Sequence, residues 1–367
     1  MKEMDLAGIR RRNMERVWSA LLRGPMSRQA LAESTGLSLM TVSNLIELFG
    51  VREAVRFEPL PREPGQPSSG RRAESISIRT DKHLLFALDL TGRQFRLHTL
   101  ALDASPLLPE FVSQEQTDQA RYEQDLRAFL MEHAELISLA LPGRSAVGLC
   151  VVTPGSYDAD SDTIRNKRIP GLNGLPLKPL VLDALAPLGS VMDCFVEEDV
   201  KLSIRAHLGR GLPDPFYYLY IGEGVGGAYS SRGEILRGLN AVAGDAGQMR
   251  YDAGRTFEQR LSLRAYRTLR QTLPVRDALS HAAKDCGALF QNIVWLLDPA
   301  LILVDCAYAM DDADWFQRCL NRELTRALSG HVARIPQIQL TGESARALLR
   351  GAAYALTQRW FERVIKD

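Results

Sequence analysis

Cysteine is scarce in this chain, and long apolar runs are absent. The five cysteines form no CxC or CxxC pair and are odd in number, which argues against a disulfide scaffold and against a cysteine-rich zinc site. They stand at positions 150, 194, 286, 306 and 319. Stretches such as Leu301–Val304 are soon followed by charge, so none approaches the run of about 18 apolar residues that a membrane span needs.

A secretory signal is also missing from the sequence. Glu3 and Asp5 precede the basic run Arg10–Arg12, and no apolar core follows them. A signal peptide has the opposite order, with basic residues directly before an apolar segment. These absences predict a soluble, cytoplasmic protein without a membrane span.

Net charge is close to zero, at +1, but it is unevenly distributed along the chain. Residues 1–80 contain 13 Lys and Arg against 9 Asp and Glu, an excess of four positive charges, so the other 287 residues carry a net charge of −3. A basic head on a mildly acidic body is typical of a nucleic-acid-binding module joined to a second domain.

The chain has 367 residues, which is too long for one ordinary domain. Its clearest boundary is the segment from Pro59 to Arg72, which is rich in proline, glycine and serine. Proline prevents helix formation there, and glycine and serine loosen the backbone. We therefore predict a small N-terminal domain in residues 1–60, a linker in residues 61–80 and a large domain in residues 81–367.

The first 50 residues contain start and stop signals for three short helices. Ser27 is suited to cap a helix over residues 28–35, which Gly36 would end, and Ser38 is suited to cap a helix over residues 39–49. An earlier helix is predicted by an apolar stripe that precedes a Gly-Pro pair. This stripe consists of Met14, Val17, Trp18, Leu21 and Leu22.

Four positions in this region match a helix-turn-helix. Ala32 lets two helices approach, Gly36 makes the turn, and Val42 and Leu45 bury the second helix against the first. An ordinary helical hairpin, which also uses glycine turns, is the alternative. Together with the linker that follows, the pattern favours DNA binding through a winged helix-turn-helix.

The third helix would then be the recognition helix. Asn44 carries the amide that reads an adenine edge, and Thr41 and Ser43 can bind phosphates or bases. Arg52 and Arg56 suit a wing, and the basic pair after the proline-rich segment suits backbone or minor-groove contacts, with a solvated linker as the alternative. The predicted DNA-binding residues are Ser27, Arg28, Ser38, Leu39, Met40, Thr41, Ser43, Asn44, Arg71 and Arg72.

Beyond the linker, short apolar runs alternate with helical patterns. The runs predict buried strands at residues 84–90, 95–102, 147–152, 191–196, 217–221 and 301–304. Helical patterns lie near residues 120–140, 200–208, 258–273 and 277–297. Strands interleaved with helices predict an α/β fold for this part of the chain.

Several short motifs follow one another in this α/β part. They are Asp89-Leu-Thr-Gly-Arg93, Pro154-Gly155, Glu197-Glu-Asp-Val200, Gly222-Glu-Gly-Val-Gly-Gly227, Ala243-Gly-Asp-Ala-Gly-Gln248, Asp298-Pro299 and Gly351-Ala-Ala353. After a winged helix-turn-helix, this series resembles the ROK family of sugar kinases and sugar-responsive repressors over nearly the whole chain. The resemblance implies an actin-like, hexokinase-like two-lobed body. The head is similar to that of the repressor branch, which includes the xylose and N-acetylglucosamine repressors.

The nucleotide motifs of that family are altered here. The first phosphate motif, usually D-x-G-G-T, lacks one glycine and the threonine in Asp89-Leu-Thr-Gly-Arg93. Glu223 brings a carboxylate into the second phosphate loop, a repulsion of about 1 kcal/mol or more. Asp305-Cys306 replaces the glycine pair expected behind the nucleotide. The resemblance therefore implies a protein that is not an enzyme and uses no cofactor.

The sugar-site motifs are altered but remain polar. Glu198-Asp199 stands where the family has Asn-Asp, whose Asp is the general base in the kinases, and Asp245-Ala-Gly-Gln248 replaces E-x-G-H. The family's three-cysteine zinc motif is missing, so no zinc site is expected. By correspondence with the family, the ligand-binding residues are Asn166, Glu198, Asp199, Asp245, Gln248 and Glu258.

Such a set is strongly acidic and contains no cation. Crowded carboxylates repel one another and raise one another's pKa, while carboxylate and amide oxygens accept hydrogen bonds from sugar hydroxyls. The set therefore predicts an amino sugar, another polyol or a cationic molecule as effector. A vestigial pocket whose carboxylates face solvent is the alternative.

Together these patterns predict a transcriptional regulator, a repressor that binds operator DNA as a homodimer or dimer of dimers and responds to a sugar or sugar derivative. Closure of the two lobes on the ligand would change the spacing of the paired heads. Two alternatives remain open: an active sugar kinase with a regulatory head, and a constitutive DNA-binding dimer with a vestigial pocket.

Overall fold

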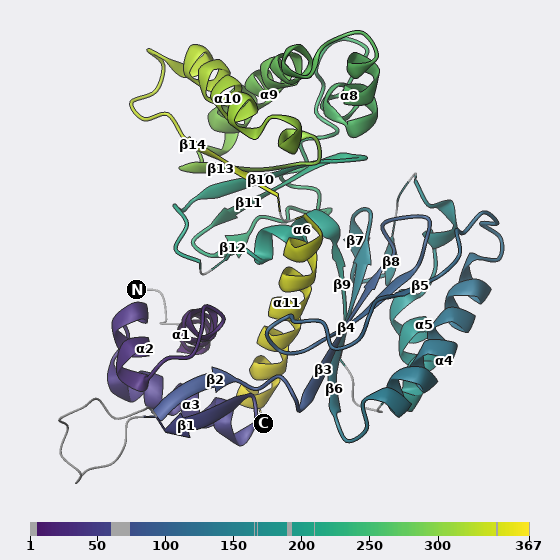
Figure 1. Ribbon diagram of the computed structural model, residues 1–367, viewed down its shortest axis with the longest axis vertical. Helices are drawn as coiled ribbons and strands as arrows, with labels where there is room; N and C mark the ends of the chain where they lie inside the picture. The colour runs from purple at the N-terminus through teal and green to yellow at the C-terminus, as the bar shows by residue number, and fades with distance from the viewer. Residues whose placement is uncertain are drawn as a thin grey trace. The chain divides into compact units, whose positions relative to one another are not determined.

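The structure of the chain is a computed structural model (Figure 1) that describes residues 6–59, 74–164, 166, 168–188, 193–208, 210–342 and 344–366. The chain divides into two compact units. Unit 1 comprises Met1–Pro154, Asp162–Val196 and Ala352–Asp367, and unit 2 comprises Gly155–Ser161 and Glu197–Gly351. Each unit is described by itself below.

The N-terminal part of unit 1, which we call the head, has three helices followed by a two-stranded antiparallel sheet. These are α1 (Leu6–Leu21), α2 (Arg28–Thr35), α3 (Leu39–Val51), β1 (Val55–Pro59) and β2 (Glu74–Ile78). The predicted caps are confirmed, since the hydroxyls of Ser27 and Ser38 accept hydrogen bonds from backbone N–H groups of α2 and α3. Gly36 ends α2 with a φ of 65°, the left-handed conformation that glycine adopts without strain.

Two details of the head differ from the sequence prediction. Leu22 follows the end of α1 and is 40% exposed, so it is not part of the buried stripe of that helix. Strand β2 lies inside the segment predicted as linker, residues 61–80. It forms there because Ile76 is buried and exchanges backbone hydrogen bonds with Met26, while the whole strand pairs with β1.

A residue from the far end of the chain completes the core of the head. Helix α11 (Ser344–Lys366) is the last element, and its Phe361 is fully buried. The Phe361 ring lies 5.1 Å from the ring of Trp18 on α1 and 4.5 Å from that of Phe49 on α3, between centroids. The boundary between the two units falls inside α11, after Gly351, so this helix contributes to both units.

The rest of unit 1 is built on a five-stranded mixed sheet with helices packed against it. Its elements are β3 (His83–Asp89), β4 (Arg96–Leu100), β5 (Phe111–Val112), α4 (Tyr122–Ala140), β6 (Ser145–Thr153), β8 (Thr163–Ile164), the 3-10 helix η1 (Pro170–Leu172), α5 (Leu177–Ala184), the 3-10 helix η2 (Ala186–Leu188) and β9 (Asp193–Glu198), whose last two residues belong to unit 2. The short strand β7 (Tyr157–Asp158) also belongs to unit 2. The strand order is β5-β4-β3-β6-β9. Strand β3 runs parallel to β6 and antiparallel to β4.

Unit 2 contains a second five-stranded mixed sheet. Its elements are α6 (Asp199–Arg205), β10 (Phe216–Ile221), β11 (Val225–Ser231), β12 (Glu234–Ile235), α7 (Phe257–Leu261), α8 (Leu263–Arg270), α9 (Val275–Leu297), β13 (Leu301–Cys306), the 3-10 helix η3 (Ala309–Asp311), α10 (Ala313–Leu328) and β14 (Gln337–Thr341). The strand order is β12-β11-β10-β13-β14. Two such sheets with interleaved helices confirm the predicted α/β class.

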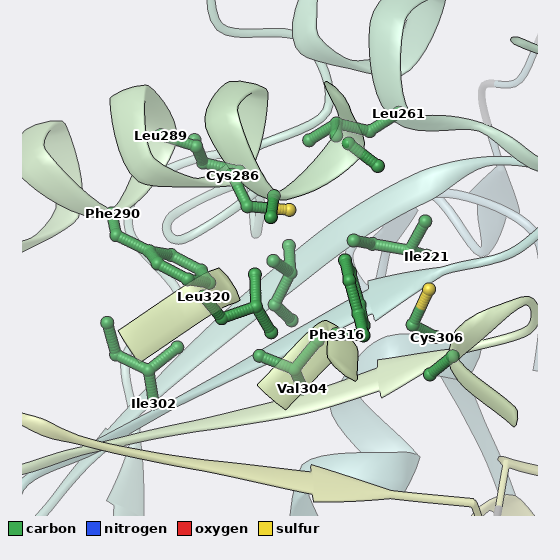
Figure 2. Packing of buried hydrophobic residues seen from close by; sticks show 14 of the residues in the cluster. Ile221, Leu261, Cys286, Leu289, Phe290, Ile302, Val304, Cys306, Phe316 and Leu320 are labelled. Atoms are coloured by element: carbon green, nitrogen blue, oxygen red, sulfur yellow. The ribbon is translucent and has the colours of Figure 1, made fainter. Parts of the chain in front are cut away.

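The two faces of the unit 2 sheet are covered differently. Helices α8, α9 and α10 lie over one face (Figure 1). Figure 2 shows Phe290 of α9 and Phe316 of α10 packed over Ile302 and Val304 of β13. Helix α6 covers part of the other face, on which Leu303 of β13 packs. Because successive residues of a strand point to opposite faces, β13 is buried on both sides.

Among the helices that the structure describes, none is both long enough and apolar enough to span a membrane. The five cysteines are free thiols, and all of them are buried.

Candidate functional site: the exposed face of the head and the carboxylate cluster

The N-terminal half of α3 presents the predicted recognition residues to solvent. Leu39 and Met40 are 55% and 76% exposed. Asn44 is exposed as well, and Thr41 and Ser43 are half-buried. The opposite face of α3 packs into the head through Val42, Leu45, Ile46 and Phe49.

Three other predicted DNA-binding residues have partners within the head. Ser27 and Ser38 cap α2 and α3. Arg28 places its Nη1 3.0 Å from Oε2 of Glu74 on β2, and its guanidinium lies 5.5 Å from the ring centroid of Phe57 on β1. Arg28 therefore ties α2 to both strands of the hairpin.

Of the basic residues predicted for a wing or for backbone contacts, the structure describes Arg52 and Arg56. Arg56 lies on β1, and its Nη2 is 3.1 Å from Oδ1 of Asp81. The backbone carbonyl of Arg52, at the end of α3, lies 2.9 Å from Nε2 of His83. Arg71 and Arg72 lie outside the described residues.

In unit 2, Glu198 and Asp199 lie at the start of α6, and the charge of Asp245 acts on Glu198. We use the name carboxylate cluster for Glu197, Glu198, Asp199, Asp245 and Glu258. Glu197 was not selected from the sequence, yet it is only 3% exposed. Its Oε1 accepts a hydrogen bond from Nη1 of Arg237 at 3.0 Å, and its Oε2 pairs with Nη2 of Arg237 and lies 3.5 Å from Nη2 of Arg205.

The bond to Glu197 also shifts the pKa of Arg237. Burial acts to lower the pKa of Arg237, but the hydrogen bonds to the Glu197 carboxylate outweigh burial and raise that pKa. Arg237 stands 40 positions after Glu197. No local pattern links the two residues, so only the folded chain shows that they pair.

Glu198 has its own cation. Its carboxylate pairs with Nζ of Lys201, one turn further along α6, and the Lys201 side chain is only 1% exposed. Burial raises the pKa of Glu198, Lys201 opposes this rise, and the nearby charges of Asp245 and Glu197 add to it. The prediction of a strongly acidic set without a cation is therefore wrong, because Lys201 and Arg237 bring positive charge to it. The spacing of three residues between Glu198 and Lys201 on a helix is a signal that the sequence offered.

The glycine segment that carries Asp245 is held tightly against the sheet. The hydroxyl of Tyr217 donates to the carbonyl of Gly244 at 2.6 Å, and Asp245 Oδ1 accepts from the N–H of Gly247 at 3.1 Å. A Cβ on Gly247 would lie 1.8 Å from the carbonyl oxygen of Val225. Since only glycine fits there, the position of Asp245 depends on a close contact with β11.

The remaining predicted ligand residues differ in how they are placed. Asp199 is half-buried as the first residue of α6. Glu258 is half-buried on α7, and its Oε2 accepts from the N–H of Val225 at 3.4 Å. Gln248 is exposed. Asn166 belongs to unit 1, where its Oδ1 accepts from the N–H of Ile169 at 2.6 Å.

The residues that replace the family's nucleotide motifs have protein partners. Asp305, at 1% exposure, accepts a hydrogen bond from the hydroxyl of Tyr218 at 2.8 Å. Burial and the neighbouring Asp305 raise the pKa of Tyr218, so this hydroxyl stays protonated and continues to donate. Glu223 is 68% exposed and lies 3.4 Å from Nη1 of Arg267 on α8. It therefore points into solvent.

Metal-binding groups are a separate matter. Over the described ranges, no three His, Cys, Asp or Glu side chains gather closely enough to hold a metal ion.

Comparison with known proteins adds the fold relationship. No protein-family model matches the chain. An N-acetyl-D-glucosamine kinase of Yersinia pseudotuberculosis is 24% identical over 261 residues, which cover 58% of this chain and 80% of the kinase. A solved ROK family transcriptional regulator, a homologue of the E. coli MLC protein, superposes with a TM-score of 0.69 at 15% identity over 98% of both chains.

Solved ROK kinases match a smaller part of this chain. The ROK hexokinase of Thermus thermophilus has a TM-score of 0.59 at 21% identity and covers 74% of this chain and 97% of its own. A ROK family glucokinase of Streptomyces griseus, solved with glucose and AMPPNP, has a TM-score of 0.58 at 18% identity and covers 74% and 98%. The chain therefore has the hexokinase-like fold of ROK proteins, as the resemblance of its motifs predicted.

Proposed function

We propose that this protein is a DNA-binding transcriptional regulator, a repressor whose ROK-type body binds a sugar or sugar derivative and has no kinase activity. The observation that carries the proposal is the head. Its α3 is capped at Ser38 and presents Leu39, Met40 and Asn44 to solvent, and the β1–β2 hairpin follows directly. A capped, exposed helix beside a hairpin is the arrangement of a winged helix-turn-helix.

In this proposal the residues of the head have three roles. Asn44 reads a base edge, with Leu39 and Met40 beside it, because an amide can form two hydrogen bonds to adenine. Thr41, Ser43 and the predicted basic pair Arg71-Arg72 contact phosphates or the minor groove. Ser27, Ser38 and Arg28 position the helices and the hairpin through the contacts described above.

The coverage of the kinase structures supports the same division of the chain. They match about three quarters of it, whereas the regulator matches nearly all of it. We propose residues 1–60 as the DNA-binding domain, residues 61–80 as the linker, with β2 completing the wing, and residues 81–367 as the sensing and dimerisation domain of a cytoplasmic homodimer or dimer of dimers.

We infer the absence of kinase activity from the altered nucleotide motifs. Asp305-Cys306 stands where the family has a glycine pair behind the nucleotide, and Asp305 is buried and accepts a hydrogen bond from Tyr218. Glu223 adds a carboxylate to the second phosphate loop, where it would repel a bound phosphate. The first phosphate motif also lacks its family glycine and threonine.

The carboxylate cluster suits a ligand rich in hydroxyls. Glu197 and Glu198 have cationic partners. We assign Asp199, Asp245 and Glu258 as acceptors for the hydroxyls of a sugar, because a carboxylate can accept several hydrogen bonds. This balance of charge favours a neutral or amino sugar over a strongly cationic effector.

The head is tested by selecting binding sites from a random pool of double-stranded DNA with the full-length protein at low salt. We expect one enriched motif, repeated with two-fold symmetry. Asn44→Ala should weaken binding to it about ten-fold, while the exposed control Asn321→Ala should leave binding unchanged. Failure to enrich any sequence would refute the proposal.

The body is tested with a panel of sugars. A coupled assay for ATP consumption should show no sugar-dependent turnover, and turnover abolished by Asp199→Asn would instead support the kinase alternative. A thermal-shift screen of the same panel should find a stabilising sugar, since a ligand that binds only the folded state raises its stability. A constitutive DNA-binding dimer would show no such shift.

A further inference from the structure

A cavity of about 460 Å³ lies on the α6 face of the unit 2 sheet. Its volume is within the range of about 300–1,000 Å³ that is usual for small-molecule sites. His207 and Arg210, just after α6, contribute to its wall, together with Leu303 of β13 and Gln339 of β14. None of the described residues that line it belongs to the carboxylate cluster.

The strand register explains why polar groups line this cavity. Gln339 pairs with Leu303 across β13 and β14, so both side chains lie on the same face of the sheet. Leu303 packs with the apolar residues of α6, which identifies this face as the α6 face. Thr341, two residues beyond Gln339, shares its orientation and also lines the cavity.

One wall of the cavity is held in place by buried groups. His207 is only 5% exposed, and its ring centroid lies 5.7 Å from that of Tyr218. Tyr218 is fixed in turn by its hydrogen bond to the buried Asp305. The imidazole therefore packs beside a tyrosine whose hydroxyl is itself hydrogen-bonded.

The chemistry of the lining differs from that of the carboxylate cluster. Arg210 supplies a positive charge, and His207, Gln339 and Thr341 supply polar groups, while Leu303 gives an apolar floor. Asp and Glu are missing from the described lining residues. A guanidinium beside polar side chains is suited to carboxylate and phosphate groups.

We propose that this cavity is a second ligand site, which binds a small organic anion. Its carboxylate or phosphate group contacts Arg210, with Gln339 and Thr341 as further hydrogen-bonding partners, and its carbon skeleton lies on Leu303. Gly342 also lines the site, and α11 begins two residues later. A bound anion therefore contacts both the end of α6 and the strand that leads into α11.

Succinate and inorganic phosphate are the probes for this proposal, because they separate the two possible anionic groups. Titration calorimetry on the full chain should detect saturable binding of at least one of them with a Kd of about 1 mM or tighter. Succinamide, the neutral analogue of succinate, should not bind.

Variants locate the site. Arg210→Gln should weaken anion binding about ten-fold or more, and Gln339→Trp, which fills the cavity from an exposed position, should abolish it. Arg326→Gln removes one charge from a side chain on α10 that is 75% exposed, and it should leave binding unchanged. Unfolding midpoints measured for all variants show whether each remains folded.

Several results would overturn the proposal. These are the absence of saturable binding for both anions, equal affinity of Arg210→Gln and the unaltered protein, or loss of anion binding in Asp199→Asn, which would place the anion in the carboxylate cluster. The proposal does not depend on the DNA-binding head, so its failure would leave the function proposed above standing.

Discussion

The capping bonds of the head and the bonds made by Glu197 and Glu258 in the carboxylate cluster span very different sequence distances. In the head, Ser27 bonds to Ala30 and Ser38 to Thr41, each three positions away. In the carboxylate cluster, Glu197 bonds to Arg237 40 positions away, and Glu258 bonds to Val225 33 positions away. Local bonds can be predicted from a short stretch of sequence, whereas the charge balance of a site depends on which distant segments the fold brings together.

The largest expected effect tests whether the head is as local as its caps suggest. Phe361→Ala removes a fully buried ring between Trp18 and Phe49 and should lower the free energy of unfolding by about 3–5 kcal/mol. Denaturant titration measures this loss. Leu139→Ala, at an 80% exposed position on α4, is the control and should change stability little. A loss equal to that of the control would show that the head needs no distant residue.

Next in size is the effect of breaking the long-range pair in the carboxylate cluster. Arg237→Met removes a cationic partner from the buried Glu197 carboxylate and should lower the free energy of unfolding by about 2 kcal/mol. Arg267→Met is the matched control, because Arg267 and Glu223 are both about two-thirds exposed and such a pair contributes about 0–1 kcal/mol.

A double-mutant cycle with Glu197→Gln separates the pair from its surroundings. The double variant Glu197→Gln/Arg237→Met should lose less stability than the two single variants together. Strict additivity would mean that Glu197 and Arg237 do not interact in solution.

The helix caps should have a smaller effect. Ser27→Ala and Ser38→Ala each remove an acceptor for a backbone N–H at the start of a helix and should each lower the free energy of unfolding by about 1 kcal/mol. Ser34→Ala is the control: Ser34 lies inside α2, where alanine is the better helix former. If the free energy of unfolding of the cap variants changes no more than that of this control, the capping hydrogen bonds do not stabilise the head.

The smallest effect concerns pH. Burial raises the pKa of Glu198 above its ordinary value of 4.5, so its contribution to stability is present at low pH and is lost as pH rises through that raised pKa. Glu198→Gln cannot ionise and should gain stability relative to the unaltered protein as pH rises through this window.

Asp193 in unit 1 provides a control of opposite sign. Burial acts to raise the pKa of Asp193, but hydrogen bonds from Arg359 outweigh it and lower that pKa. Asp193 therefore stabilises the fold above its ordinary pKa of 3.8, and this contribution disappears as the pH falls through the lowered pKa. Asp193→Asn should lose stability relative to the unaltered protein at neutral pH. If the stability of both variants, relative to the unaltered protein, changed in the same direction with pH, the opposite pKa shifts of Glu198 and Asp193 would be refuted.

Much of the fold followed from local patterns. The helices of the head and strands such as β3, β6, β10 and β13 lie where caps and apolar runs predicted them, because both signals act within a few residues. Helix α11 was not predicted. Its sequence spreads apolar and polar residues around the whole helix, so it shows no one-sided stripe.

For the carboxylate cluster, the sequence and the family resemblance supplied the carboxylates but not their partners. Lys201 was overlooked although its spacing from Glu198 was visible. Arg237 could not be paired with Glu197, because that pairing requires the loop after β12 to fold back towards the start of α6. Asn166 is the opposite case. The family motif selected it as a ligand residue, but its side-chain oxygen accepts a hydrogen bond from the backbone N–H of Ile169.

The burial of Phe361 has a consequence for the synthesis of the chain. Phe361 stands 312 positions after Phe49, the α3 residue it contacts. At ribosomal rates of about 5–20 residues per second, it is added roughly 15–60 s later. During that time the nascent head lacks one ring of its aromatic core. A chain that stops before Phe361 would therefore have an incomplete aromatic core in its head.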